Sequence, residues 1–561
     1  MEEQMFYKEL IAEIIKSKSS TIDEVLKIRR DLCRRHNPKT LPSLIQIFLH
    51  ATPAQMKKLQ FLTTKPTRTI SGVAPVAIMT SPEKCPHGKC LMCPGGPKSF
   101  FGEVPQSYTG KEPATMRGIR NEFDPYLQVF NRLEQYVILN QNFEKVELII
   151  MGGTFPARNK EYQEEFVKYA FKALNDFGEM FFKNNEFDFS KFKKFFLLPA
   201  DIHDKVRIEK IKEKLFKLKK KCELETEQNK NETTKVHCIG LTIETRPDYA
   251  LLKHANQMLK LGCTRVELGI QTVYPNVLKS IDRGHRVSDS IIALEILKDL
   301  GFKINAHYML GLPKTSKQKD LKGLKKLFSN QSFRPDMLKI YPCMVLPGTE
   351  LEKLYYKKKF KPLSTKDAIK ILAEFKRSIP SYLRIMRIQR DIPTKRTIAG
   401  VDKTNLRQEL QNYMEKKNIK CNCIRCREVG RSKKLGKVEI TVEKYQASNG
   451  REYFIAAEDI ENNVLLGFCR MRFPFKFLRK EISPKTALIR ELHVYGIAAG
   501  LTEKGDTQHK GYGYKLMQKA EEIAKAKGKT KMVVISGIGV REYYIKKLGY
   551  QKEGPYVTKK I

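Results

Sequence analysis

The sequence predicts an α/β protein in which a sheet of repeated strand–helix units is preceded by a small helical domain and followed by an α+β module. From about residue 72 to 345, short apolar runs alternate with helical patterns, which is typical of a doubly wound sheet or of a partial or full (β/α) barrel. A new α+β pattern starts at Lys437 and continues to the end of the chain. With 561 residues the chain exceeds one ordinary core, so we expect two to four domains.

Residues 1–71 are predicted to form the helical domain. Thr21 and Glu24 make a capping box ahead of an apolar-periodic segment, and Thr52-Pro53 marks a second helix start. The helix after Thr21 has a basic face that would suit a phosphate backbone, although a solvated charged face explains it equally well. The face consists of Lys27, Arg29, Arg30, Arg34 and Arg35, followed by His36 and Lys39.

Six strands and several helices are predicted for the central α/β domain, which we place at 72–394. The expected strands are Val73–Met79, Val146–Met151, Val236–Ile243, Arg265–Ile270, Ile304–Leu310 and Met337–Val345, with helices such as Pro125–Leu139, Tyr162–Leu174, Leu251–Leu261 and Ser288–Leu300 between them. Chemistry in such sheets sits in loops at the C-terminal ends of the strands. The Lys/Glu-rich stretch 203–235 is predicted to be a charged excursion on the surface with no chemistry.

Composition and charge indicate a globular protein with a polyanionic partner. Hydrophobic residues make up 41% of the chain and aromatic residues 9%, which is enough for packed interiors, while the formal net charge is +43. Nucleic acid is the leading candidate partner, and a Lys-rich solvated surface is the alternative. The N-terminus lacks the basic and apolar regions of a secretory signal, and no stretch of about 18 apolar residues is present. We therefore expect a cytoplasmic protein without a membrane span.

The twelve cysteines include two tight clusters, which points to metal rather than to disulfides. In the first cluster, Cys85, Cys90 and Cys93 follow directly on the first predicted strand. Three thiolates on one loop can each hold one iron of a [4Fe–4S] cluster, which leaves the fourth iron free to chelate S-adenosylmethionine (SAM). A structural zinc site that lacks one ligand is the alternative interpretation of the spacing alone.

Polar and glycine-rich motifs at the next strand ends favour the iron–sulfur interpretation. The paired glycines of Met151-Gly152-Gly153-Thr154-Phe155 would let backbone approach a ligand closely. With these motifs, the region from about 72 to 390 resembles the radical-SAM superfamily. The resemblance implies a barrel of radical-SAM type, catalytic Cys85, Cys90 and Cys93, and SAM contacts from Gly152, Gly153, Thr154, Glu244, Arg246 and Gln271.

The C-terminal module, 437–561, contains a predicted phosphate-binding loop. The strand that includes Glu491-Leu492-His493-Val494 leads into Gln508-His-Lys-Gly511-Tyr512-Gly513-Tyr514 and a helix, so backbone N–H groups at the helix start can face a pyrophosphate. This order of elements resembles the GNAT acetyltransferase family, in which the pyrophosphate of acetyl-CoA rests on this loop. Tyr543-Tyr544 opens the last helix. Plain packing explains the pair, but we favour a Tyr544 hydroxyl near the thioester as a catalytic group.

The combination of a radical-SAM module and a GNAT module in one chain is similar to the family of the catalytic subunit of Elongator. The resemblance implies an acyltransferase that forms 5-carboxymethyluridine at wobble position 34 of tRNA from SAM and acetyl-CoA. It also places Lys145, Glu491, Leu492, His493, Val494, Tyr512, Gly513, Tyr514 and Tyr544 near acetyl-CoA. The loop between Cys85 and Cys90 is shorter than in eukaryotic members, so its conformation is not implied by the family.

The second cysteine cluster, Cys421-Asn-Cys423-Ile-Arg-Cys426, lies in a predicted linker at 395–436. It supplies three thiolates, one short of a closed tetrahedral zinc site. The family has a zinc-bearing linker here, so the resemblance implies zinc with an unidentified fourth ligand. Its role would be to fix the orientation of the modules, and a reduced, metal-free cluster is the alternative.

The mechanistic hypothesis is that a 5′-deoxyadenosyl radical takes a hydrogen atom from the acetyl methyl group and that the resulting carbon radical adds to C5 of uridine. Loss of an electron and a proton restores the ring, and thioester hydrolysis frees CoA. The anticodon stem-loop would be gripped by the N-terminal helices and by Lys65–Arg68 and Arg384–Arg390, with further Elongator-like subunits or self-association left open. Two rival hypotheses are a protein lysine acetyltransferase with a structural iron–sulfur module and a non-catalytic tRNA-binding scaffold.

Overall fold

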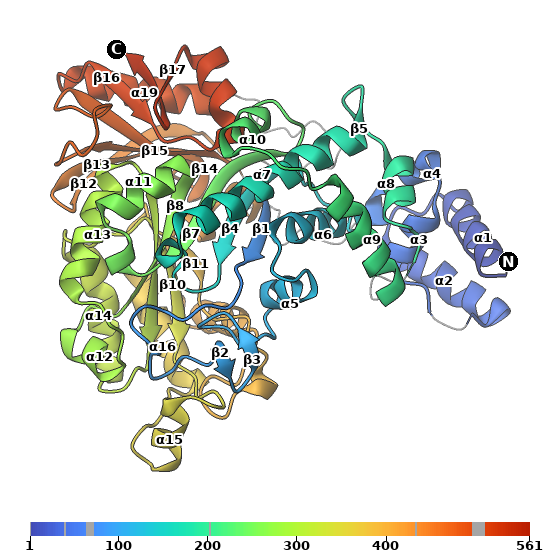
Figure 1. Ribbon diagram of the computed structural model, residues 1–561, viewed down its shortest axis with the longest axis horizontal. Coiled ribbons are helices and arrows are strands. Elements are labelled where there is room, and N and C mark those ends of the chain that lie inside the picture. Colours follow the sequence, from blue (N-terminus) through green and yellow to red (C-terminus); the bar gives the residue numbers. More distant parts are fainter. Residues whose placement is uncertain (1, 39–40, 63–71, 201–203, 432–434, 496–510) are drawn as a thin grey trace.

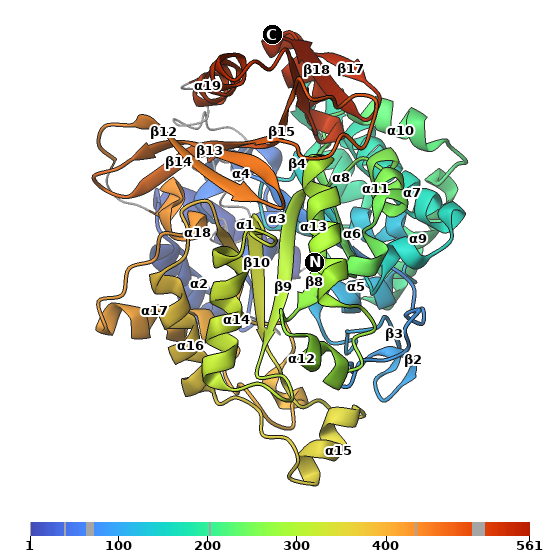
Figure 2. The ribbon, with the colours of Figure 1, turned by 90° about the vertical axis from the view of Figure 1, so that its left-hand side faces the viewer.

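The computed structural model describes residues 2–38, 41–62, 72–200, 204–431, 435–495 and 511–561, and Figure 1 shows their arrangement. A small group of N-terminal helices lies at one end of the molecule, a parallel sheet with its covering helices forms the middle, and a second sheet lies against one end of the first (Figures 1 and 2). No helix in the described part of the chain is both long and apolar enough to cross a membrane.

The N-terminal helices form where capping residues were predicted. Thr21 and Glu24 make the expected capping box at the start of α2, and Thr52 and Gln55 make another at α4. The helices bury their own cluster of apolar side chains, which includes Leu10, Val25 and Leu32. Their bounds are α1 Glu2–Lys16, α2 Ile22–His36, α3 Leu44–His50 and α4 Pro53–Lys58.

The central domain contains a seven-stranded parallel sheet in the order β1-β4-β7-β8-β9-β10-β11. Because β1 and β11 stand at opposite ends of this order, the sheet is a partial barrel rather than a full one. All six predicted strands are present, and β11 is a seventh that the sequence did not reveal. The strands are β1 Ala74–Met79, β4 Lys145–Met151, β7 His237–Thr245, β8 Cys263–Gln271, β9 Lys303–Leu310, β10 Met337–Pro342 and β11 Arg384–Arg387.

Helices cover the outer face of this sheet and bury its apolar side chains. The covering and flanking helices are α5 Pro113–Arg120, α6 Pro125–Ile138, α7 Lys160–Phe181, α8 Phe189–Phe195, α9 Lys205–Leu218, α10 Leu224–Asn231, α11 Leu252–Lys260, α12 Pro275–Ser280, α13 Val287–Asp299, α14 Lys317–Ser329, α15 Glu350–Tyr356, α16 Thr365–Arg377, α17 Leu406–Lys416 and α18 Ile424–Arg427. Two short hairpins, β2 Gly96–Ser99 with β3 Gly102–Val104 and β5 Phe182–Lys183 with β6 Glu186–Phe187, complete the domain.

The inner face of the sheet is only partly buried, so buried and half-buried residues alternate along the strands. In β1 and β4 every second residue is fully buried on the helix side, whereas Pro75, Ala77, Glu147 and Ile149 between them are half-buried or exposed. These inward-facing positions line a cavity. An unfilled lumen is what distinguishes this sheet from a barrel whose interior is packed with side chains.

The stretch 203–235 is more ordered than the sequence suggested. It contains α9 and α10, and the side chains of Arg207, Glu227 and Asn231 are buried. Arg207 forms an ion pair with the buried Glu134 of α6, and Asn175 of α7 donates to Glu227 at 2.8 Å. The prediction of a surface excursion was therefore wrong for these residues, because a Lys/Glu-rich composition concealed a few well-spaced inward positions.

The C-terminal domain is a second seven-stranded sheet, in the order β12-β13-β14-β15-β16-β18-β17, with α19 packed on it. Strands β15 and β16 pair in parallel only from Thr486 to Ile489, so the next residues of β15 have no partner strand on that side within the described chain. The elements are β12 Glu439–Ala447, β13 Gly450–Asp459, β14 Val464–Phe473, β15 Thr486–Val494, α19 Tyr512–Ala526, β16 Lys531–Val534, β17 Gln551–Glu553 and β18 Tyr556–Lys560.

The two sheets meet through buried charges and through close backbone contact. Arg490 of β15 bonds both carboxylate oxygens of Asp336, at 2.8 and 2.5 Å, just before β10 begins. Arg472 of β14 bonds Asp299 at the end of α13 at 2.7 Å. A Cβ atom on Gly537 would lie 2.1 Å from the carbonyl oxygen of Ile239 in β7, so only glycine allows this approach. The two domains therefore form one packed body.

Candidate active site

One cavity of about 820 Å³ runs through the partial barrel from the cysteine loop to the C-terminal domain. Its lining includes Cys85, Cys90 and Cys93 from the loop after β1, and Glu491 and His493 from β15. The volume lies within the roughly 300–1,000 Å³ typical of small-molecule sites. The sequence left open whether its two predicted sites share a cavity, and the structure brings them together.

Each of the three loop cysteines has its own set of neighbours. Cys93 accepts a hydrogen bond from the backbone N–H of Ser107 at 3.2 Å, and Cys85 lies 3.6 Å from the Thr154 hydroxyl. Cys90 is approached by His87 Nε2 at 3.1 Å and by the guanidinium of Arg283 at 3.6 Å. Hydrogen-bond donors around each sulfur suit thiolates that carry negative charge.

The glycine-rich turn after β4 brings backbone next to the cysteine loop. Gly152 and Gly153 both have positive φ angles, of 126° and 103°, and a Cβ on Gly152 would lie 2.2 Å from the Thr80 hydroxyl. A Cβ on Gly153 would lie 4.0 Å from Cys85 Sγ. The conformation therefore requires glycine at Gly152, and it brings the backbone at Gly153 close to Cys85.

Two further predicted SAM contacts have features that are typical of ligand sites. Arg246 is fixed by Asp248 at 2.9 and 2.6 Å, but its Nη1 is buried and finds no partner among the described residues. Gln271, the last residue of β8, has a φ of 66°, which is uncommon for a residue other than glycine. An unpaired buried donor and a strained backbone beside a cavity both indicate a ligand site.

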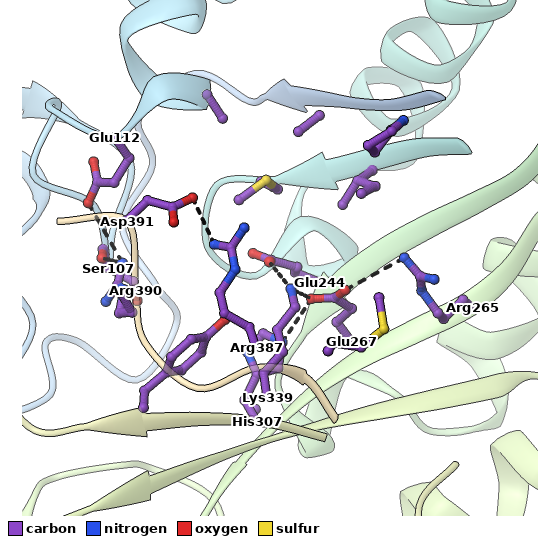
Figure 3. Close-up of a pocket in the computed structure, with 18 of the residues that line it drawn as sticks. Ser107, Glu112, Glu244, Arg265, Glu267, His307, Lys339, Arg387, Arg390 and Asp391 are labelled. Atoms are coloured by element: carbon purple, nitrogen blue, oxygen red, sulfur yellow. Dashed lines mark hydrogen bonds and ion pairs between the residues drawn. The ribbon is translucent and has the colours of Figure 1, made fainter. Parts of the chain in front are cut away.

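Midway along the cavity, Glu267 holds a group of charged side chains that Figure 3 shows from within the barrel. Its carboxylate contacts the ammonium group of Lys339 and accepts from His307 at 2.8 Å and from Asn305 at 3.1 Å. Burial by itself raises the pKa of Glu267, but Lys339, His307 and Arg265 together hold it well below its usual range. Glu267 is therefore ionised at neutral pH.

Glu244 belongs to the same group and faces the cavity. Tyr108 donates to one of its oxygens at 2.8 Å, and the ammonium of Lys339 lies 3.7 Å from the other. Glu244, Glu267 and His307 lie close enough together to hold a metal ion. The Lys339 ammonium already supplies the positive charge there, so this group is better described as an ion-paired cluster than as a metal centre.

On the C-terminal side, Glu491 and His493 face the cavity in different electrostatic states. Burial raises the pKa of Glu491, but Lys303 and Arg470 outweigh this effect, so the pKa lies below its usual value. Arg470 also donates a hydrogen bond to Glu491 at 2.9 Å. Burial lowers the pKa of His493 to about 4, so its imidazole is neutral at pH 7. Leu492 and Val494 lie on the stretch of β15 that has parted from β16.

The predicted phosphate loop is described only from Gly511 onward, and Gln508 lies outside the described residues. Gly511 caps α19 with a φ of 72°, and no atom of the described residues lies within 4 Å of a Cβ added to it. Tyr512 and Tyr514 start the helix, and Tyr514 is exposed. An open helix start of this kind suits an anion.

Tyr544 and Lys145 lie away from the cavity lining. Tyr544 packs in the core of the C-terminal domain against Tyr550, whereas the neighbouring Tyr543 is exposed and its hydroxyl would lie 2.9 Å from a Cβ on Gly513. Of the two tyrosines, Tyr543 is therefore nearer the predicted acetyl-CoA loop. Lys145 is the exposed first residue of β4, at the end of the sheet that faces the C-terminal domain.

The second cysteine cluster is more compact than the first. The sulfur atoms of Cys421, Cys423 and Cys426 all lie within 4.8 Å of one another, and the buried Lys376 approaches Cys426 at 3.5 Å. Thiolates that converge on one point suit a single ion, whereas a cubane cluster needs its ligands farther apart. The two clusters therefore differ in the kind of metal group that they fit.

The structure gives the predicted RNA-binding strip at Arg384–Arg390 mixed roles. Arg384 is largely buried in β11, where it bonds Glu428 at 2.9 Å and the hydroxyl of Tyr495 at 2.7 Å. It links the two domains and is not available to a phosphate. Arg387 and Arg390 line the cavity, and Arg390 reaches across to the Ser107 carbonyl (Figure 3). Lys65–Arg68 lies outside the described residues.

Sequence reasoning missed several cavity residues, among them Lys339, Tyr108 and Arg283. A signal was available in β10, where Lys339 interrupts an otherwise apolar strand two positions after Met337 and two before Tyr341. In a strand this spacing places all three side chains on one face. A charge in that pattern indicates that the face is not packed in a core.

Four family models match successive parts of the chain. Residues 3–70 match the ELP3 N-terminal domain, residues 79–322 the radical SAM superfamily, residues 335–416 the radical SAM C-terminal domain and residues 426–550 the acetyltransferase (GNAT) family.

Curated relatives match along nearly the entire chain. A tRNA uridine(34) acetyltransferase of Methanocaldococcus infernus is 47% identical over 93% of this chain and 92% of its own length. Elongator complex protein 3 of Homo sapiens is 36% identical over 95% of this chain and 93% of its own. A solved structure of the archaeal Methanocaldococcus infernus Elp3 with an N-terminal deletion superposes with a TM-score of 0.72 at 41% identity, and the match covers 88% of this chain and 100% of that one.

Proposed function

The chain belongs to the family of the tRNA uridine(34) acetyltransferases and Elongator complex protein 3, and from this membership we propose that it modifies uridine 34 of tRNA. It is an acyltransferase of the radical SAM class that forms 5-carboxymethyluridine from acetyl-CoA. The observation that carries the proposal is the single cavity with the cysteine loop at one end and β15 at the other. A reaction that joins an acetyl carbon to a uracil carbon needs both modules to open into one space.

The residues at the cysteine loop fit the cofactors that the radical SAM fold implies, a [4Fe–4S] cluster and SAM. Cys85, Cys90 and Cys93 would ligate three irons. Gly152, Gly153, Thr154, Glu244 and Gln271 would contact SAM, and the unpaired Nη1 of Arg246 suits a carboxylate or hydroxyl acceptor. When bound, this pair supplies a 5′-deoxyadenosyl radical that can take a hydrogen atom from the acetyl methyl group.

The C-terminal domain fits the acetyl-CoA that a GNAT fold implies. We propose that Gly511, Tyr512, Gly513 and Tyr514, with Gln508, receive the pyrophosphate. Glu491, Leu492, His493 and Val494 would flank the acyl end where β15 parts from β16. Lys145 and Tyr544 remain candidates from the family resemblance, and the position of Tyr543 beside Gly513 makes its hydroxyl a further candidate.

The compact thiolate group of Cys421, Cys423 and Cys426 suits zinc. Helix α18, which contains Cys426, lies against β11 and β14, so an ion there would fasten the linker to both domains. The chain is expected to hold one zinc that remains when the iron is removed. Cys423→Ser should lose the zinc and keep the iron, as measured by elemental analysis of the purified protein. Loss of iron instead of zinc would contradict the assignment.

The tRNA contact is proposed to involve the anticodon stem-loop, the basic face of α2, and Arg387 and Arg390 at the cavity. Arg30 and Arg34 lie on α2 with their side chains available to solvent. Elongator complex protein 3 is named as part of a complex, whereas the archaeal relatives are named as enzymes. The mass of the purified chain with and without tRNA would distinguish action alone, self-association and assembly with further subunits.

A protein lysine acetyltransferase would need a general base next to the acyl group, and the obvious carboxylate is already occupied. Glu491 is buried and paired with Arg470 and Lys303. Nothing in the described cavity favours a lysine substrate over a nucleotide. A non-catalytic scaffold is disfavoured by the intact cysteine loop and by the cavity that it lines.

The test is an anaerobic reaction of the cluster-reconstituted protein with dithionite, SAM, methyl-labelled acetyl-CoA and tRNA. Label should appear in 5-carboxymethyluridine after nuclease digestion. Cys90→Ala should abolish the label and 5′-deoxyadenosine formation, because one iron loses its ligand. Cys222→Ala, which removes a cysteine far from the loop in sequence and outside the cavity lining, should leave both intact. A labelled protein in place of labelled tRNA would favour the lysine acetyltransferase.

A further inference from the structure

Lys339 lines the cavity between the cysteine loop and the C-terminal domain. The side chains of Met337, Lys339 and Tyr341 share the inner face of β10, and successive members are about 7 Å apart along the strand. Met337 pairs with Arg384, the residue that bonds Tyr495 of the C-terminal domain. Met337 therefore lies at the end of the cavity near the C-terminal domain, which would deliver the acetyl group. Lys339 lies two residues farther along β10, toward the cysteine loop.

The ammonium of Lys339 is fixed in position by its neighbours. It contacts Glu267, lies 3.7 Å from Glu244, and its side chain is 12% exposed. His307 and Asn305 hold Glu267 from the next strand, so the carboxylate cannot follow a moving lysine. An ammonium has three N–H donors, and the described residues provide two carboxylate partners, which leaves one donor for a ligand in the cavity.

An ammonium group can only donate hydrogen bonds, and this property separates uracil from cytosine. Uracil carries a carbonyl oxygen at C4, next to the reacting C5, whereas cytosine carries an amino group at the same place. A donor held beside C5 is satisfied by the uracil carbonyl and is opposed by the cytosine amino group. A base that has left the anticodon stack presents this edge to the cavity wall.

We propose that Lys339 reads the C4 carbonyl of the target base and so selects uridine over cytidine, with Glu267 and His307 as positioning residues. The proposal rests on the tRNA-modifying function and adds a residue that sets its specificity. The alternative acceptor for the same N–H group of Lys339 is the thioester carbonyl of acetyl-CoA. That alternative predicts no effect of Lys339 on base preference.

The test compares binding of two RNA stem-loops that differ only in U or C at position 34. The cluster-reconstituted full chain is used under nitrogen without reductant, so that SAM is not consumed. The unaltered protein should bind the U stem-loop roughly tenfold to a hundredfold more tightly than the C stem-loop. Taking the ratio cancels the general effect of a lost positive charge on RNA binding.

Three variants make the result specific. Lys339→Gln carries an amide that can donate or accept, so the U/C ratio should fall to within about threefold of one. Lys339→Arg keeps a donor-only group and should retain the preference. Lys322→Gln removes a lysine from the exposed face of α14 and should leave the ratio unchanged. Thermal melting checks that each variant is folded, and Glu267 keeps His307 and Asn305 in all of them.

The outcomes distinguish the role of Lys339 from the proposed tRNA-modifying function. An unchanged U/C ratio in Lys339→Gln, with stem-loop binding and uridine modification intact, overturns the role of Lys339 and leaves the proposed function standing. An unchanged ratio with weaker acetyl-CoA binding assigns the donor to the thioester instead. Failure of the unaltered protein to bind either stem-loop or to modify tRNA would overturn the proposed function itself.

Discussion

Two groups of buried carboxylates in this protein are each paired with cationic side chains but differ in their surroundings. At the interface between the domains, Asp336 and Glu452 are matched by Arg490 and Arg472, and all four side chains are at most 1% exposed. In the cavity, Glu267 is equally buried, but its partner Lys339 and the neighbouring Glu244 are 12% and 13% exposed. The first group is enclosed on all sides, whereas the second adjoins open space.

This difference indicates which charges hold the fold and which are available to a ligand. A fully enclosed ion pair has no water to replace a missing partner, so breaking it is strongly destabilising. A pair beside a cavity can exchange a partner for water or substrate at lower cost. Perturbed groups at a cavity are therefore better functional candidates than perturbed groups enclosed in the interface.

The largest expected effect is on the interface. Asp336→Asn should lower the free energy of unfolding by about 3–5 kcal/mol, because Arg490 and Arg470 lose the carboxylate between them. The chain has no tryptophan, so urea unfolding is best followed by circular dichroism. As a matched control, Glu350→Gln breaks an exposed pair with Lys353 and should change stability by no more than about 1 kcal/mol.

A change in the cavity should separate stability from activity. Glu267→Gln is expected to cost about 1–3 kcal/mol of stability, because water and Glu244 can take over part of the pairing of Lys339. Activity, measured as kcat/KM for 5-carboxymethyluridine, should fall by about a hundredfold as Lys339 is displaced. If Glu267→Gln destabilises the protein as much as Asp336→Asn, the contrast between the two groups is wrong.

The smallest effect concerns pH. Burial lowers the pKa of His493 to about 4. As the pH falls through 6.5, the unfolded chain therefore binds a proton at this residue, whereas the folded chain does so only near pH 4. Stability should therefore fall on acidification below pH 6.5 and level off near pH 4. Between pH 6.5 and 5 the loss from this group is about 2 kcal/mol.

His493→Gln should remove that part of the pH dependence. The difference between the two proteins in melting temperature at pH 6.5 and pH 5 measures it, since the other titrating groups are common to both. An identical slope in the variant would mean that His493 is accessible to protons in the folded protein, which would make it a candidate acid–base group of the cavity.

The sequence was sufficient for most of the fold because its strands are apolar and regularly spaced. The predicted strand Val73–Met79 corresponds to β1 Ala74–Met79, and Ile304–Leu310 corresponds to β9 Lys303–Leu310. Strand β11 was missed because its Arg384-Ile-Met-Arg387 has only two apolar residues between two arginines and resembles a basic surface strip. Its arginines are explained only by partners such as Glu428, which lie far along the chain.

The candidate site was predictable where local motifs determine it and not where the tertiary structure does. The cysteine loop and Gly152-Gly153 could be read from sequence because cluster ligation and a positive φ demand particular residue types. The group around Glu267 comes from three different strands, and no local pattern brings Glu267, His307 and Lys339 together. The gap between β15 and β16 likewise depends on pairing that ends after Ile489.

The close approach of Gly537 to β7 has a consequence for the engineering of this protein. A Cβ on Gly539 would also lie 2.7 Å from the side chain of His237, so the two domains are in close contact at both glycines. A GNAT domain with side chains at these two positions would clash with β7 and could not be grafted onto this barrel unchanged. An exchange of the C-terminal module would therefore have to keep both glycines.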